Sequence, residues 1–460
     1  MTPTPEPNPG WSPDAWQRAG GAHQFQYDDP QDLARVLAQL AAFPPLVTSW
    51  EIERLKKELA QAQAGERFLL QGGDCAEMLR DCTPGAITNK LKILLQMSLV
   101  LVHASKKPVI RVGRFAGQYA KPRSSPTETR TVDGQSVTLP SYFGDLVNAP
   151  EFEPRARRPD PMQMLRAYTR SALSLNFIRS LVEGGFADLH HPEYWDLSFF
   201  SHASLAPGVR DRYERMVERL GDGLRFMEAL GERTIDDLTR VEFFTSHEGL
   251  NLYYEQAQTR TVPRREGWYD LTTHMPWIGD RARQPDGAHV EFFRGVRNPV
   301  GVKIGAEADP AQIARVCQRL NPDDEPGKVV LITRLGAERV RDLLPTLISR
   351  VADAAGRVLW VCDPMHANTQ STTGGIKTRS FDAILAELET TFETHAACGS
   401  HLGGVHFELT GEDVTECGGG AAGVTEADLS ARYASFCDPR LNYQQALEMA
   451  MRLGTLMGRT

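Results

Sequence analysis

The sequence lacks the features that would place it in a membrane or outside the cell. In its 460 residues no run approaches 18 uncharged apolar residues, about the length that a membrane-spanning helix needs. The first residues, MTPTPEPNPGWSPDAW, contain no basic region followed by an apolar core, unlike a secretory signal. The seven cysteines form no C-x-x-C pair and are odd in number, which argues against a disulfide framework and a zinc knuckle. We therefore expect a cytoplasmic protein with no membrane association.

An excess of positive charge is also missing. The formal net charge is −8, so the chain as a whole does not attract nucleic acid, and we expect no nucleic-acid partner. Hydrophobic residues make up 41% and charged residues 24%, as in an ordinary globular protein. The length suffices for one large domain with additions or for two domains.

Short apolar runs that end in polar residues recur along the chain and predict strands. Eight such runs occur, at 67–75, 108–117, 241–248, 268–279, 299–305, 328–336, 357–364 and 402–411. Helical patterns such as DPAQIARVCQRL and SFDAILAELETTFETHAA lie between most of them. Strands that alternate with helices pair in parallel through crossover helices. Eight strands in an α/β pattern favour a (β/α)8 TIM barrel over an open sheet.

The remaining segments predict additions to this barrel. Residues 1–45 are rich in proline at first and form an N-terminal extension, and residues 46–460 form the catalytic barrel. TSWEIERLKKELAQAQ predicts a helix, because it combines a Thr/Ser cap with Glu–Lys pairs at helical spacing. The second and third strands are too far apart for one crossover. Residues 121–235 between them carry a lid loop over 121–155 and an inserted helical pair over 161–185 and 210–231.

The active site of such a barrel lies at the carboxyl ends of its strands. Each of the eight predicted strand ends offers a reactive or charged side chain. These are Cys75, Arg114, Glu248, His274, Lys303, Arg334, His366 and Glu408. Any one of them could serve only a salt bridge or a buried hydrogen bond. Together they predict a single site with two parts.

The first part is an anion site. Arg114, Lys303 and Arg334 are donors to a multiply charged anion, because guanidinium groups match phosphate and carboxylate oxygens in pairs. The segment QYAKPRS adds Lys121, Arg123 and Ser124 at the head of the long loop. These residues either bind a second anionic group or form a solvated basic loop. We expect the ligands to be phosphorylated metabolites.

The second part is a metal site. Cys75, His366 and Glu408 supply a thiolate, an imidazole and a carboxylate, and SFCDPRLN adds Asp438 as a possible fourth ligand. Mixed ligation of this kind suits Mn, Fe, Co or Zn better than Mg or Ca. Asp363 lies near His366 in the sequence and could orient it or a water molecule.

Several motifs resemble one known family. LLQGGDCAE, RVGRFAGQYAKPRS, SHEGLNLYYE, HMPWIGDR, GVKIG, LITRLGAERV, WVCDPMHANT and GGVHFELTGEDVTEC resemble the type II (plant-like) 3-deoxy-D-arabino-heptulosonate 7-phosphate (DAHP) synthases. The resemblance runs from about residue 45 to the C-terminus. It implies a metal-dependent condensation of phosphoenolpyruvate with erythrose 4-phosphate, the first step toward aromatic compounds. It also implies a homo-oligomer and a possible chorismate mutase partner.

The resemblance assigns residues to this chemistry. It implies that Cys75, His366, Glu408 and Asp438 bind the metal, with Mn²⁺ or Co²⁺ favoured over Zn²⁺ or Fe²⁺. The implied phosphoenolpyruvate site consists of Arg114, Asp280, Arg281, Lys303 and Arg334. Lys121, Pro122, Arg123 and Ser124 would bind erythrose 4-phosphate. Glu248 or Asp280 would orient the attacking water, and Lys303 or His366 would handle the proton on the new alkoxide.

The chain departs from the family pattern at several positions. Asp280 replaces a glutamate, Phe143 replaces an arginine in SYFGD, and Gly249 and Asn251 alter the segment HEGLNL. Two alternatives to the synthase follow. One is a secondary-metabolism variant that takes a modified, for example amino-substituted, four-carbon acceptor. The other is a catalytically silent relative that binds metabolites or a partner enzyme.

Overall fold

The computed structural model describes residues 10–21, 25–184 and 242–458, together with 208, 210–216 and 218. Its main feature is an eight-stranded parallel sheet with the strand order β5-β2-β1-β14-β11-β10-β9-β8. The strands are β1 (Phe68–Gly73), β2 (Val109–Arg114), β5 (Phe244–Thr245), β8 (Trp277–Ile278), β9 (Val300–Gly305), β10 (Val329–Arg334), β11 (Leu359–Cys362) and β14 (Leu402–Glu408). Each of the eight predicted segments contributes one strand to this sheet.

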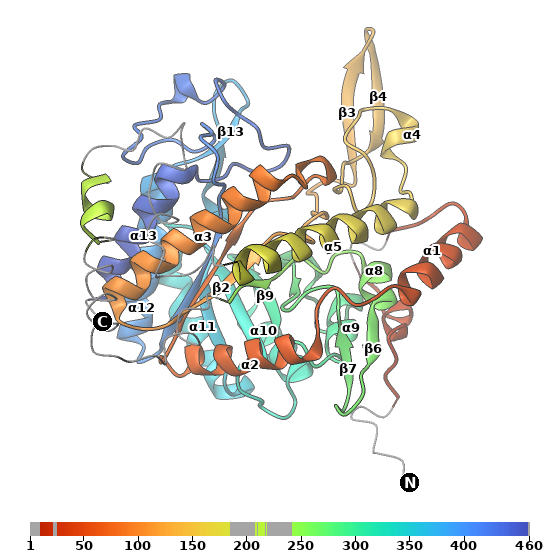
Figure 1. Cartoon of the computed structure of the whole chain (residues 1–460), viewed down its shortest axis with the longest axis horizontal. Coiled ribbons are helices and arrows are strands. Elements are labelled where there is room, and N and C mark those ends of the chain that lie inside the picture. The colour runs from red at the N-terminus through yellow and green to blue at the C-terminus, as the bar shows by residue number, and fades with distance from the viewer. Residues whose placement is uncertain are drawn as a thin grey trace.

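The two edge strands of this sheet meet. The N–H of Trp277 donates to the carbonyl of His247 at 3.0 Å, and the N–H of Gly249 donates to the carbonyl of Trp277 at 3.0 Å. The sheet therefore curls on itself in a TIM-barrel-like α/β fold, with helices outside it (Figure 1).

The outer helices follow the strands as the sequence pattern predicts. They are α3 (Pro84–Ser105), α8 (Leu252–Ala257), α9 (Ala288–Phe293), α10 (Pro310–Leu320), α11 (Val340–Ala355), α12 (Phe381–Ala397) and α13 (Tyr443–Met457). By length and composition α3 could cross a membrane, but 78% of its apolar window is buried inside the structure. That burial is typical of a core helix.

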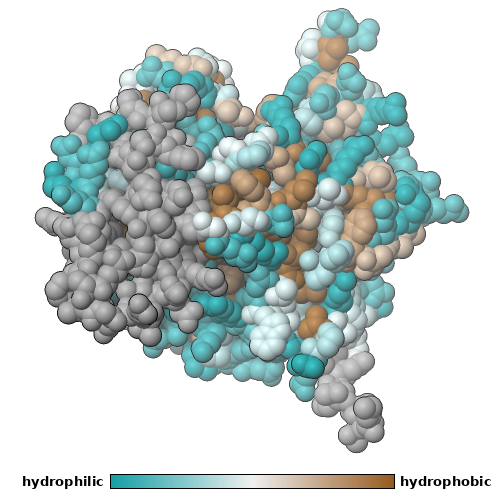
Figure 2. Space-filling model, viewed as in Figure 1, coloured by the Kyte–Doolittle hydropathy of each residue, from teal (hydrophilic) through white to brown (hydrophobic). Residues whose placement is uncertain are grey.

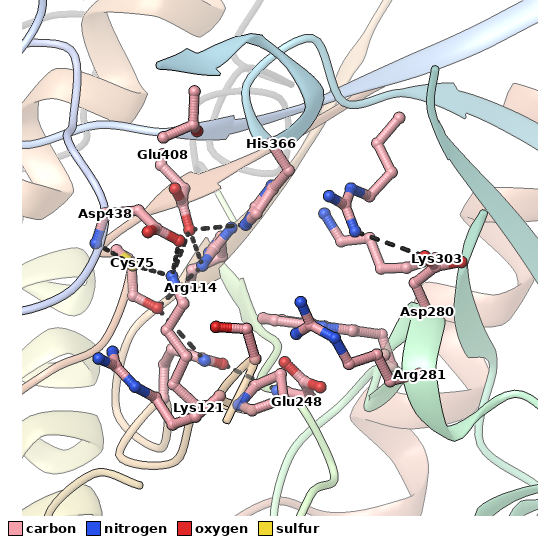
Figure 3. Close-up of a pocket in the computed structure, with 18 of the residues that line it drawn as sticks. Cys75, Arg114, Lys121, Glu248, Asp280, Arg281, Lys303, His366, Glu408 and Asp438 are labelled. Atoms are coloured by element: carbon pink, nitrogen blue, oxygen red, sulfur yellow. Dashed lines mark hydrogen bonds and ion pairs between the residues drawn. The ribbon is translucent and has the colours of Figure 1, made fainter. Parts of the chain in front are cut away.

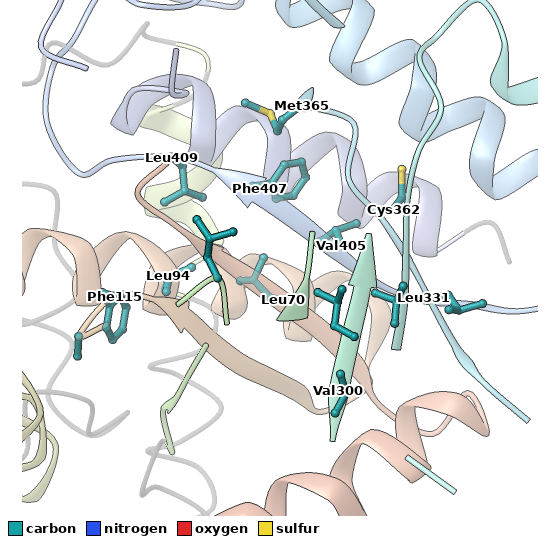
Figure 4. Close-up of a cluster of buried hydrophobic side chains, with 14 of the residues drawn as sticks. Leu70, Leu94, Phe115, Val300, Leu331, Cys362, Met365, Val405, Phe407 and Leu409 are labelled. Atoms are coloured by element: carbon teal, nitrogen blue, oxygen red, sulfur yellow. The ribbon is translucent and has the colours of Figure 1, made fainter. Parts of the chain in front are cut away.

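The barrel has an apolar floor. Helix α2 (Ser49–Gln63) begins at a capping box in which Thr48 and Glu51 satisfy each other's backbone N–H groups. Leu55 and Leu59 of α2 join one buried cluster with Leu69 and Val330 of the strands. The alternate strand residues join the second cluster, between sheet and helices (Figure 4); they include Leu70, Leu331, Cys362 and Val405. Because strand side chains alternate between faces, the first cluster is the barrel interior, and α2 closes its N-terminal end.

The segment 268–279 differs from the prediction of one strand. β7 (Trp268–Asp270) pairs with β6 (Thr259–Thr261) in a separate antiparallel hairpin, and only β8 joins the main sheet. His274 lies between the two, so it does not end a barrel strand.

The expected lid loop over 121–155 is also more ordered than predicted. β3 (Thr127–Val132) and β4 (Gln135–Pro140) form an antiparallel hairpin that projects from the body (Figure 1). Its turn residues Asp133 and Gly134 have φ angles of 49° and 77°, and two positive φ values are what a two-residue type I′ turn requires. α4 (Pro154–Arg157) follows this hairpin.

Of the predicted helical pair, the first member is α5 (Met162–Glu183). The second, 210–231, lies largely outside the described residues. Figure 2 shows apolar side chains gathered over the middle of one face, where α5 crosses it. Leu173 of α5 is half exposed, so the described part of the chain leaves the outer side of α5 partly uncovered.

The described residues of the N-terminal extension, 10–21 and 25–45, form a segment that lies along the barrel; we call it the N-terminal segment. It contains η1 (Ala15–Arg18) and α1 (Pro30–Ala42), which begins at the capping side chain of Asp29. The indole N–H of Trp16 donates to Gln256 at 2.9 Å, which attaches the segment to α8. The other short elements are η2 (Leu79–Asp81), η5 (Asp280–Ala282), η6 (His366–Asn368), β12 (Thr369–Ser371), β13 (Lys377–Arg379) and η7 (Glu426–Asp428).

Candidate active site

The carboxyl ends of the barrel strands surround a cavity of about 250 Å³. Fourteen of the fifteen residues that the strand ends and the resemblance assigned to a site line this cavity. They are Cys75, Arg114, Lys121, Pro122, Arg123, Ser124, Glu248, Asp280, Arg281, Lys303, Arg334, His366, Glu408 and Asp438. Their roles stay predictions, but their convergence on one space follows from the barrel geometry.

His274 is the one predicted strand-end residue that does not line the cavity. Its Nδ1 accepts a hydrogen bond from the N–H of Thr245 at 2.9 Å, and burial lowers its pKa. The expectation that it belongs to the site is wrong, because the strand that reaches the cavity begins three residues later.

Metal-ligand side chains gather on one side of the cavity (Figure 3). The sulfur of Cys75 and one carboxylate oxygen each of Glu408 and Asp438 lie within 4.8 Å of one another. Nε2 of His366 is 3.0 Å from Oε1 of Glu408. A thiolate, an imidazole and two carboxylates fit a divalent transition metal, so the donor set agrees with the predicted metal site.

His366 is held by the residue that its sequence position suggested. Its Nδ1 is 2.6 Å from Oδ2 of Asp363, which leaves Nε2 facing Glu408. The backbone N–H of His366 also donates to Asp363, at 3.3 Å. A carboxylate on the far nitrogen of a metal-binding histidine fixes its ring orientation and raises its basicity.

Glu408 is fully buried and anionic. Burial alone would raise its pKa, but His366, Lys121 and two arginines hold it well below its usual range. Arg379 donates to Oε2 of Glu408 at 2.7 Å. Lys121 contacts Cys75 and lies 2.5 Å from Oδ2 of Asp438. The cluster of acids is thus embedded among cations.

Arg114 is fixed in place by several partners. Its Nη2 donates to Glu408 at 3.0 Å and to the carbonyl of Cys75 at 3.1 Å. Its guanidinium carbon lies 5.1 Å from the Trp277 ring centre. Nη1 is 2.6 Å from Nε2 of His406, whose pKa falls well below its ordinary value because of burial and nearby cations. A neutral His406 can accept this hydrogen bond and orient Arg114.

Sequence reasoning missed His406 and Arg379. A signal existed for His406, because it stands two residues before Glu408 and the period of a strand puts both on one face. No such signal exists for Arg379, which reaches Glu408 from β13 in a separate hairpin.

Cations line the opposite side of the cavity (Figure 3). Burial lowers the pKa of Lys303 to about 8, although its contact with Asp363 opposes the shift. Nη1 of Arg334 lies 3.5 Å from Oδ2 of Asp280. The other oxygen of Asp280 accepts hydrogen bonds from Arg283 and from the N–H of Gly305, both at 2.8 Å. Asp280 is therefore occupied in holding neighbouring groups.

Glu248 differs from Asp280. Its Oε1 is buried and has no hydrogen-bond partner among the described residues. Burial raises the pKa of Glu248 to about 7, although Lys121 and Lys303 counteract the shift. A carboxyl group with a free oxygen and a pKa near neutrality is suited to bind water or transfer a proton.

Comparisons with known proteins agree with the motifs. The family model for the class-II DAHP synthetase family matches residues 11–454. A phospho-2-dehydro-3-deoxyheptonate aldolase from Neurospora crassa is 47% identical over 467 residues, which cover 98% of this chain and 95% of the relative. A protein of the same name from Streptomyces coelicolor is 46% identical over 435 residues, 95% of each chain. The chain belongs to the class-II DAHP synthetase family.

Proposed function

We propose that this chain is a 3-deoxy-7-phosphoheptulonate synthase, which converts phosphoenolpyruvate, erythrose 4-phosphate and water into DAHP and phosphate. Family membership supports the reaction. The observation that carries the proposal is that a metal-ligand cluster and a set of cations line the same cavity. In the proposed reaction the cations would bind the phosphate groups of both substrates, and the metal would activate the aldehyde.

Cys75, His366, Glu408 and Asp438 would hold a divalent metal, with Mn²⁺ or Co²⁺ favoured and Zn²⁺ or Fe²⁺ as alternatives. A bound metal supplies Lewis acidity that polarises the aldehyde oxygen of erythrose 4-phosphate. Asp363 supports the site by orienting His366.

The cations position the substrates. Arg114, Arg281, Lys303 and Arg334, with Asp280 holding Arg334, would bind the phosphate and carboxylate of phosphoenolpyruvate. Lys121, Pro122, Arg123 and Ser124 would bind the phosphorylated aldose. Two substrates held in one orientation react far faster than free ones, because the entropy of bringing them together is already lost on binding.

The protons and the water are assigned to specific groups. C3 of phosphoenolpyruvate attacks the aldehyde carbon, and Lys303 donates a proton to the new alkoxide. Its pKa of about 8 leaves it charged but able to give up that proton. Glu248 orients the water and accepts the proton that this water loses as its oxygen adds to C2. Phosphate then leaves with cleavage of the bond between C2 and the phosphate oxygen. We assign this water to Glu248 and not to Asp280, whose oxygens are occupied.

The positions at which the chain departs from the family pattern bear on the identity of the acceptor sugar. Of Asp280, Phe143, Gly249 and Asn251, only Asp280 lines the cavity. The residues assigned to erythrose 4-phosphate are unchanged, so we retain it as the acceptor. Homo-oligomerisation, a chorismate mutase partner and a cytoplasmic location stay predictions from the sequence.

The test is substrate turnover by chelator-treated protein with and without added Mn²⁺. We expect metal-dependent loss of phosphoenolpyruvate and release of one phosphate per molecule consumed. Unphosphorylated erythrose is the matched control, and it should react poorly because it leaves Arg123 and Ser124 without a ligand. The proposal fails if folded, metal-loaded protein consumes no phosphoenolpyruvate in the presence of erythrose 4-phosphate.

A further inference from the structure

The segment before the predicted sugar-phosphate residues rests against residues 143–146. The N–H of Lys121 donates to the carbonyl of Phe143 at 2.8 Å, and the N–H of Leu146 donates to the carbonyl of Tyr119 at 3.0 Å. The backbones approach so closely that a Cβ on Gly144 would lie 2.2 Å from the carbonyl oxygen of Tyr119. The position of Lys121 therefore depends on the position of Phe143.

Phe143 is held in turn from two sides. Its N–H donates to Oδ1 of Asn148 at 2.9 Å. Its ring does not line the cavity and packs instead on Phe25 of the N-terminal segment, with ring centres 5.3 Å apart and planes at 71°. Phe25 is 9% exposed, so this edge-to-face contact is largely shielded from water.

The N-terminal segment is attached at a second point two residues later. The side-chain amide of Asn251 donates to the hydroxyl of Tyr27 at 2.9 Å, and the Tyr27 ring packs on Tyr253 at 5.8 Å. Gln26 between the two aromatic residues is exposed, as expected for an extended segment whose alternate residues face inward.

We propose that Phe25 and Phe143 are positioning residues for Lys121, Pro122, Arg123 and Ser124, so that the N-terminal segment sets how tightly the phosphorylated aldose binds. The chain of contact runs from the Phe25 ring to the Phe143 ring, and from the Phe143 carbonyl to the backbone of Lys121. Tyr27 and Asn251 keep Phe25 in place. The expected change in aldose binding rests on the proposed function. The chain of contacts from Phe25 to Lys121 does not.

The experiment compares Phe25→Ala and Phe143→Leu with the unchanged protein. We expect the KM for erythrose 4-phosphate to rise about two- to thirteenfold, the range that corresponds to the loss of one aromatic pair. The KM for phosphoenolpyruvate should stay unchanged, and Phe25→Tyr should retain normal kinetics because it keeps the ring. Hydrogen exchange should also accelerate at the amide of Lys121 in Phe25→Ala and Phe143→Leu.

Phe43→Ala is the matched control. It removes an aromatic pair of the same N-terminal segment, Phe43 with Tyr168 at 5.0 Å, and among the described residues neither ring contacts Lys121. An equal rise in KM in this control, or unchanged KM and unchanged exchange in Phe25→Ala, would overturn the inference. If the unchanged protein shows no turnover, the proposed function fails, while the exchange measurement still tests the positioning contact.

Discussion

Glu248 is a buried carboxyl group whose pKa is raised to about 7, mainly by burial. In the unfolded chain its pKa is near 4.5, so between these values the folded protein binds a proton that the unfolded chain does not. The free energy of unfolding must then fall as the pH rises through this window, by about 3 kcal/mol in total. The stability that the protonated group contributes is complete below pH 4.5 and is lost above pH 7.

We predict that the free energy of unfolding falls less between pH 4.5 and pH 8 in Glu248→Gln than in the unchanged protein. Urea unfolding at the two pH values measures this difference. Glu387 offers a matched control, because its pKa is also raised to about 7 by burial but it lies outside the cavity. Glu387→Gln should reduce the decline as well. Only Glu248→Gln should change the pH profile of kcat near pH 7. If both substitutions altered the pH profile of kcat equally, the role assigned to Glu248 in the reaction would be wrong.

Lys303 carries the second prediction at this scale. Its ammonium group lines the cavity, and its contact with Asp363 fixes it without filling its remaining N–H groups. Lys303→Met should lower kcat by roughly 10²- to 10⁴-fold, the usual contribution of a positioned proton donor. Metal affinity, measured by calorimetry, should change little, because no assigned metal ligand contacts Lys303. Normal turnover in this variant would exclude the role assigned to lysine.

At the scale of elements, the contact between 119–121 and 143–146 gives a prediction about glycine. Gly144 has a φ of 100° and no room for a Cβ. Gly144→Ala should destabilise the protein by about 1–3 kcal/mol and weaken binding of the phosphorylated aldose. Gly134 in the β3–β4 turn has a φ of 77° but open space around it. Gly134→Ala should therefore cost about 1 kcal/mol and leave substrate binding unaffected, as thermal unfolding and KM values would show.

The same scale separates what the sequence predicts from what it does not. Strand ends such as Arg114 and Glu408 were predictable, because an apolar run followed by a charged residue marks the end of a buried strand. The failure at 268–279 has a physical cause. Backbone groups at the start of this segment form hydrogen bonds outside the main sheet; the N–H of Asp270, for example, donates to the side chain of Asn298 at 2.9 Å. This part of the segment is therefore extended without being a strand of the barrel.

Contacts between distant elements were beyond sequence reasoning. Arg379 reaches Glu408 only because the β12–β13 hairpin lies next to the end of β14. Likewise Phe25 and Phe143 meet across more than a hundred residues. No periodicity encodes such pairs. The Asp133-Gly134 turn of the β3–β4 hairpin is different, because an Asp-Gly pair between two strands is a local signal for a two-residue turn, although only a loop was predicted there.

At the scale of the whole molecule, the barrel interior divides into two layers. Apolar side chains and α2 fill the N-terminal end, and charged side chains fill the carboxyl end. The charged layer includes Cys75, Glu408 and Asp438, which are brought together from chain positions far apart in sequence. A ligand that joins them therefore links β1, β14 and the segment after it, and it should stabilise the whole fold and not one loop.

This leads to a prediction about metal and stability. A ligand that binds only the folded state stabilises it by about 2.7 kcal/mol at a hundredfold excess over its Kd. For a chain of this size that shift corresponds to a rise in Tm on the order of a few degrees. Chelator-treated protein should therefore show a Tm that increases with added Mn²⁺, and Asp438→Asn should diminish the increase. Asp413→Asn, which alters an exposed ion pair with Arg432, should respond to Mn²⁺ like the unchanged protein.

If Tm is independent of Mn²⁺, or if the two variants respond alike, the cluster at the end of β14 is not a metal site. The cations around it would then serve only to neutralise buried acids.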